Sequence, residues 1–224
     1  MKHIKPYKIF ESTSLNFPTT REEVIEVCKK YDIENYTIND DLSIDVAGGV
    51  NLAYKNLEHL PLKFNYVSGN FLCRINKLKS LEGCPRTVNG SFFCNDNELK
   101  TLEGSPQTIG GNFLCYENEL KSFEGSPQTV GGGFYCADNE LRDLEYFPEV
   151  DGSTNMRENP VNLLLYTFIY LPEANNFLIE YFNDYEIIRN RDTVMLDRLQ
   201  TFIRDNNLKM PDLDEIKKHY KIIE

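Results

Sequence analysis

The chain has 224 residues, enough to bury a core in one elongated domain, and its formal net charge is −11. This charge argues against binding to a nucleic-acid backbone or an anionic membrane and leaves basic or apolar protein surfaces as partners. The longest apolar run, 163–171, is too short and too interrupted to span a bilayer. The first residues lack the apolar stretch of a secretion signal, and the six cysteines are interpreted as reduced thiols, so we expect a cytoplasmic protein.

Residues 1–45 are expected to form an N-terminal cap made of a helix and strands. Thr19 or Thr20 can cap a helix whose first turn holds two glutamates, a favourable position for negative charge. Two short strands are predicted at 36–38 and 42–46, on either side of a polar turn. An end coil of a repeat structure would otherwise expose its core, so a cap is needed there.

The middle of the chain, residues 46–160, repeats one sequence four times. Each copy starts 21 residues after the previous one, and partial copies extend the pattern at both ends. Self-similarity at a fixed short period predicts a solenoid in which each copy forms one coil of a stack. The four copies begin at Val67, Val88, Ile109 and Val130.

Within a copy, Phe71 and Cys73 alternate, which predicts a short strand with both side chains facing the interior. Six such strands would form a parallel sheet roughly 25 Å across, at about 4.8 Å per strand. The cysteine in each copy is expected to act as a small hydrophobe. A single cysteine per copy is not a metal-binding motif, so we expect no metal and no cofactor.

A column of asparagines follows the strands. A buried amide both donates and accepts, so such a column can satisfy the backbone where each coil turns; the alternative is that these are surface turn residues. A Glu-Gly-x-Pro segment comes next, and its Gly and Pro predict an extended or 3₁₀ back to each coil. The asparagines are Asn76, Asn97, Asn118, Asn139 and Asn159.

The repeat resembles the leucine-rich repeat, with Phe71, Cys73, Asn76, Leu78 and Leu81 matching that motif's spacing and Phe and Cys replacing two leucines. The resemblance implies an α/β leucine-rich-repeat solenoid with a parallel sheet. The segments Cys-Tyr-Glu-Asn-Glu-Leu and Ser-Leu-Glu-Gly-Cys-Pro also look like repeats of bacteriophage and bacterial proteins, as does the stretch that leads into the first coil. That likeness implies a viral protein acting in the host cytoplasm.

Residues 161–224 lose the repeat and are expected to form a C-terminal helical cap over the last coil. The segment could also offer a binding surface of its own. Apolar residues at helical spacing and capping residues predict four helices. They are expected to start near Val161, Pro172, Asp192 and Pro211.

Two outward columns of strand residues are the candidate functional surface. One holds four large apolar side chains, which soluble proteins rarely leave uncovered, and the next varies in chemistry as a recognition surface can. Beside them runs a row of acids that we interpret as a solubilising edge: Asp96, Glu117, Asp138 and Glu158. The alternative is that duplication copied the outward residues without any partner. The candidate partner-binding residues are Leu72, Arg74, Phe93, Asn95, Leu114, Tyr116 and Tyr135.

Catalytic residues are not evident from the sequence. The histidines His3, His59 and His219 are scattered, and nothing in the sequence places a cysteine beside one of them. We therefore expect a non-enzymatic protein-binding module, and the resemblance to phage proteins implies an inhibitor of a host or defence protein. A structural protein that self-associates through the same face is the alternative, and the chain would then be a weak homo-oligomer instead of a monomer. An enzyme would need a clustered polar pocket in the C-terminal segment.

Overall fold

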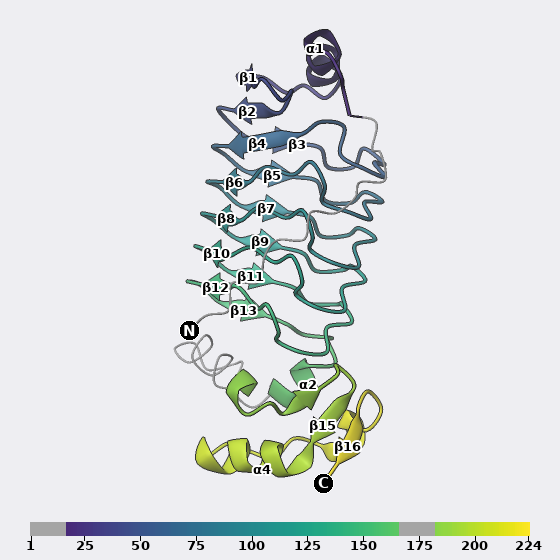
Figure 1. Cartoon of the computed structure of the whole chain (residues 1–224), viewed down its shortest axis with the longest axis vertical. Helices are drawn as coiled ribbons and strands as arrows, with labels where there is room; N and C mark the ends of the chain where they lie inside the picture. Colours follow the sequence, from purple (N-terminus) through teal and green to yellow (C-terminus); the bar gives the residue numbers. More distant parts are fainter. Residues whose placement is uncertain (1–16, 166–181) are drawn as a thin grey trace.

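A computed structural model describes residues 17–165 and 182–224, and it has the form of a long stack of coils (Figure 1). The solenoid predicted from the repeat is confirmed. Each coil carries two very short strands, one for each of two sheets that run the length of the stack. The strand-bearing side of the solenoid is therefore bent into two sheets.

The predicted six-stranded parallel sheet is present, and its strands contain the first two residues of every Phe-x-Cys segment, with the cysteine directly after the strand. Its strands pair in register, so equivalent residues of successive copies are neighbours, as with Phe71 and Phe92. In stacking order the strands are β3 (Val50–Asn51), β5 (Phe71–Leu72), β7 (Phe92–Phe93), β9 (Phe113–Leu114), β11 (Phe134–Tyr135) and β13 (Thr154–Asn155).

A second sheet of seven strands precedes it in each coil. Its first two strands were predicted as strands of the N-terminal cap, but the other five were not. From the second copy on, each strand of this sheet is only two residues long and has no alternation of its own, so the sequence pattern does not mark it. All neighbours are parallel except β1 and β2, which are antiparallel. The order is β1 (Tyr36–Ile38), β2 (Ile44–Val46), β4 (Phe64–Val67), β6 (Thr87–Val88), β8 (Thr108–Ile109), β10 (Thr129–Val130) and β12 (Glu149–Val150).

A column of glycines forms the corner between the two sheets. Gly90 N donates to Gly69 O at 3.1 Å, and the same bond repeats along the stack. A Cβ added to Gly69 would lie 2.8 Å from the carbonyl carbon of Gly48, and one added to Gly152 would lie 2.7 Å from that of Gly132. Backbones approach so closely here that only glycine fits.

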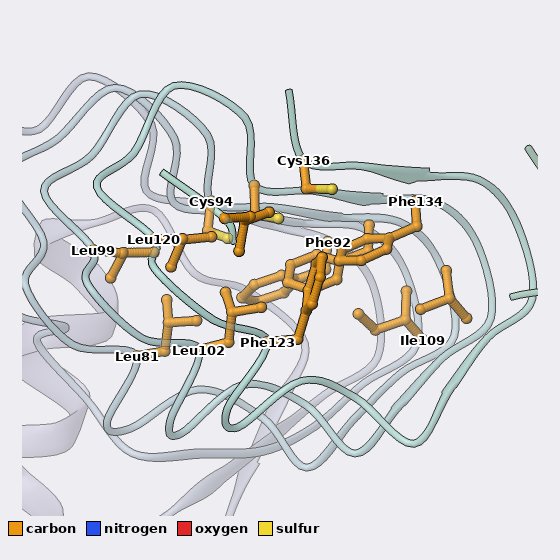
Figure 2. Close-up of a cluster of buried hydrophobic side chains, with 14 of the residues drawn as sticks. Leu81, Phe92, Cys94, Leu99, Leu102, Ile109, Leu120, Phe123, Phe134 and Cys136 are labelled. Atoms are coloured by element: carbon orange, nitrogen blue, oxygen red, sulfur yellow. The ribbon is translucent and has the colours of Figure 1, made fainter. Parts of the chain in front are cut away.

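Phenylalanine rings stack through the centre of the solenoid. The ring centroids of Phe71 and Phe92 are 5.5 Å apart, and those of Phe113 and Phe134 are 5.2 Å apart. Figure 2 shows Phe92 and Phe134 beside Phe123, with leucines of the same core around them. All four stacked rings are fully buried, which stabilises the fold by about 1.5–3 kcal/mol for each ring.

The four repeat cysteines are buried beside the rings and unpaired, as predicted. Burial raises the pKa of the Cys115 thiol well above its ordinary value, so the thiol stays protonated and packs as a small hydrophobe.

The asparagine column forms the predicted hydrogen-bond ladder and is not a set of surface turn residues. Asn118 Nδ2 donates to the carbonyl oxygens of Cys94 and Cys115, both at 3.1 Å, and its Oδ1 accepts from Leu99 N at 3.0 Å. Because Cys94 and Leu99 belong to the preceding coil, each such amide joins two coils. The same bonds recur at Asn97 and Asn139.

The N-terminal cap has the predicted elements. Helix α1 (Arg21–Lys30) begins with a capping box, in which Thr20 Oγ1 accepts from Glu23 N at 3.2 Å and Glu23 Oε2 accepts from Thr20 N at 3.3 Å. Val24 and Cys28 are the fully buried side chains of this helix and join the core of the solenoid.

The C-terminal segment packs beyond the last coil (Figure 1) and contains more strand than expected. The helix predicted from Asp192 starts later, because Val194 lies on a strand and only matches the helical spacing of the residues that follow. The helix predicted from Pro172 lies outside the described residues. The described elements are α2 (Asn162–Leu165), β14 (Ile188–Arg189), β15 (Thr193–Met195), α4 (Leu196–Asp205), α5 (Leu213–Ile216) and β16 (Lys221–Ile223).

Polar contacts fix this segment to the last full coil. Tyr220 Oη donates to Arg142 O at 2.8 Å, and an Arg142 guanidinium nitrogen donates to His219 O at 2.7 Å. Arg191 Nε lies 3.0 Å from the largely buried Asp143 Oδ2. The segment therefore closes the C-terminal end of the stack.

Candidate functional surface

Four large apolar side chains lie in register on the outward side of the six-stranded sheet. Their strand neighbours face inward and are fully buried, whereas these four are partly exposed. Parallel pairing places the four on consecutive rungs, about 4.8 Å apart. We call this row the apolar stripe; it consists of Leu72, Phe93, Leu114 and Tyr135.

The last member of the stripe is held against its own coil and the coil that follows. Tyr135 Oη lies 3.4 Å from Ser153 Oγ. A Cβ added to Gly133 would lie 2.6 Å from Tyr135 Oη, so the ring occupies the space that a larger residue at 133 would need. Tyr135 is therefore the member of the stripe whose polar atom already has a neighbour in the protein.

The second outward column is uneven. Arg74 and Tyr116 are partly exposed, but Asn95 between them is only 1% exposed and donates a hydrogen bond to Asp96. Within the described residues, Asn95 Oδ1 has no hydrogen-bond donor. Asn95 therefore cannot contact a partner on this surface as it stands, and we leave it out of the surface proposed below.

Tyr54 belongs to the same surface and was missed by the sequence analysis. It is 65% exposed, and the Arg74 guanidinium lies 5.8 Å from its ring centroid. Tyr54 occupies, in the first coil, the position that Ile75 fills in the second coil and an acid fills in the later ones. A large aromatic side chain at a solvent-facing repeat position was the available signal.

The acidic row lies beside the second outward column, at the turn that follows each strand. All four residues adopt left-handed backbone conformations, with φ between 53° and 56°. The pKa of Glu117 is raised, first by its hydrogen bond with Asp96 and then by the negative charges of Asp96 and Asp138. The row is thus a line of carboxylates that repel one another.

Burial raises the pKa of Tyr116, and the negative charges of Asp96 and Glu117 raise it further. Along its coil, Tyr116 lies between Leu114 of the stripe and Glu117 of the acidic row. Apolar, aromatic and acidic groups are adjacent on one continuous surface.

A cavity of about 590 Å³ lies between the last coil and the C-terminal segment. Its lining includes Asp143, Glu145 and Arg191, but the principal charged groups already interact, because Arg191 pairs with Asp143. Burial raises the pKa of Asp143. These contacts serve the docking of the C-terminal segment.

Within residues 17–165 and 182–224, no three His, Cys, Asp or Glu side chains are grouped so as to hold a metal ion. No helix in these same ranges is long and apolar enough to cross a membrane. Comparison with protein-family models, curated proteins and solved structures found no match to this chain.

Proposed function

We propose that this chain is a non-enzymatic protein-binding module whose partner seats on the outward face of the six-stranded sheet. The observation that supports the proposal is the apolar stripe, four large side chains in register and partly exposed. Arg74, Tyr54 and Tyr116 border it, and Arg and Tyr are residue types enriched at the energetic centres of interfaces. Because the stacked backbone holds the surface rigid, binding costs little conformational entropy.

The resemblance of the repeat to leucine-rich repeats and to bacteriophage proteins suggests a more specific role. A phage-encoded protein of this kind would act in the host cytoplasm, where its partner would be a host or defence protein that it inhibits. The repeat face would supply the contact, and no cofactor would be needed.

Self-association through the same face is the second candidate, because an exposed apolar stripe can pair with its own copy. The net charge of −11 and the acidic row oppose it, since two such faces would bring like charges together. Light scattering over a concentration series separates the two candidates. A monomer at all concentrations excludes self-association.

The test of partner binding is affinity capture from the natural source cell with parent and variant chains. Phe93→Asp places a charge in the middle of the stripe and should remove the captured protein. Thr108→Asp adds the same charge at an exposed position of the seven-stranded sheet and should retain it. Circular dichroism of both variants checks the fold. Equal capture by all three chains would show that this face is not the interface.

A further inference from the structure

The spacing of the apolar stripe selects the kind of backbone that can lie along it. The stripe runs across the strands, with side chains at about 0, 4.8, 9.6 and 14.4 Å. In an α-helix, positions i, i+3, i+7 and i+10 rise about 0, 4.5, 10.5 and 15 Å, which matches every rung to within about 1 Å. Side chains on one face of an extended strand are about 6.6 Å apart, so a strand laid along the stripe would already be out of step with the 4.8 Å spacing at the second rung.

The width of the surface also fits a helix. Phe93 and Asp96 are three residues apart on one coil, so the stripe and the acidic row are at most about 10 Å apart. A helix with its side chains is about 10–12 Å in diameter. The helix reaches about 5–6 Å to each side of its axis, so a helix whose axis lies between the stripe and the acidic row would contact both.

The negative charge of the acidic row determines which side chains the helix would carry on the flank that faces it. Asp96, Glu117 and Asp138 form a line on consecutive coils, and Glu117 already interacts unfavourably with both neighbours. Lysine or arginine side chains over this line would relieve the repulsion, and the adjacent Tyr116 ring can contact a cation through its face. A second copy of this chain, at net charge −11, lacks that complementarity.

We propose that the outward face binds an amphipathic α-helix of about 11 residues or more, whose apolar side chains lie on the stripe and whose lysines or arginines lie over the acidic row. This inference rests on the proposed function and names the chemistry of the partner. Recognition combines apolar burial on one side of the helix with charge pairing on the flank.

The test uses three labelled synthetic peptides titrated with the full-length protein and followed by fluorescence anisotropy. The first has leucine at i, i+3, i+7 and i+10 and lysine on its flanks. The second replaces the lysines by glutamates. The third scrambles the first so that no apolar face forms. We expect only the first to bind, with an affinity that falls as salt is raised.

Matched variants separate this site from general charge attraction. Asp96→Asn with Glu117→Gln should weaken binding at least tenfold. Glu98→Gln with Glu119→Gln removes the same charge from the ion-pair ladder with Lys79 and Lys100 and should change binding less than twofold. Phe93→Asp should also weaken it at least tenfold, although it adds a negative charge that would attract the peptide.

Equal weakening by the two double variants, equal binding of the scrambled peptide, or no binding of the first peptide would each overturn the inference. A different set of results would contradict the proposed function itself. If Phe93→Asp still removes the captured cellular protein while the lysine peptide does not bind, only the helical partner is wrong. If Phe93→Asp removes nothing from the capture, the interface itself is wrong.

Discussion

Replacing Asn118 by alanine tests whether the asparagine ladder holds the coils together. The change removes the acceptor of Leu99 N and the donor to Cys94 O, Cys115 O and Tyr116 O. The ladder amides of the neighbouring coils still donate to the two cysteine carbonyls, so the largest loss is the Leu99 N–H.

An unsatisfied buried donor costs about 1–3 kcal/mol, and each further hydrogen bond adds about 0.5–1.5 kcal/mol. We therefore expect Asn118→Ala to lower the free energy of unfolding by about 3–5 kcal/mol. Urea unfolding followed by circular dichroism measures this, with the exposed Gln107→Ala as control. A loss below about 1 kcal/mol, or one equal to the control, would refute the structural role of the ladder.

Asn118→Asp keeps an acceptor but removes the donor and places a carboxylate against the same carbonyl oxygens. The folded state then favours the protonated acid, so the pKa of the new side chain should be raised above its unfolded value. Its stabilising contribution is present below the unfolded pKa and is lost as the pH rises through the folded pKa. The variant should therefore be less stable than Asn118→Ala at pH 7 and recover on acidification.

Three further predictions concern the corner, the acidic row and the C-terminal segment. Gly111→Ala should destabilise the chain by about 2 kcal/mol or more in urea unfolding, because its Cβ would lie 2.9 Å from the Gly90 carbonyl carbon; an unchanged midpoint contradicts this. The pKa of Glu117 is raised in the folded state, so the stabilising contribution of this side chain is lost as the pH rises through that pKa. The Tm of Glu117→Gln minus the Tm of the parent should therefore increase between pH 4 and pH 7. Arg191→Ala leaves Asp143 without its ion-pair partner and should cost about 1–2 kcal/mol, measured by thermal unfolding at pH 7; no loss would mean that the pair does not dock the segment.

The repeat made the solenoid, the asparagine ladder and the outward stripe predictable, because equal residues at a fixed period must become neighbours in a stack. The second sheet could not be predicted in the same way. Val88 and its equivalents were visible as apolar positions, but a two-residue strand between a turn and a glycine has no periodicity to detect.

The sequence pattern predicted which residues of the candidate surface face outward, but not how exposed each side chain is. Alternation along the strand gives the outward side of Phe93 and Arg74, and both are partly exposed as expected. The burial of Asn95 depends on its neighbours in adjacent coils, and the exposure of Tyr54 depends on its place at the start of the stack. Such cross-coil effects are absent from the pattern of a single copy. The strand at 193–195 was missed because its one buried apolar residue coincided with a helical spacing.

The ladder amides have a consequence for how such a molecule can change in size. Every interior coil presents to the next coil the same groups that it receives from the one before, and only the two end segments are unlike the rest. Inserting or deleting a 21-residue unit among the interior copies would therefore conserve each junction and shift the ends by one step of about 4.8 Å. The length of the outward face can therefore change only in whole coils.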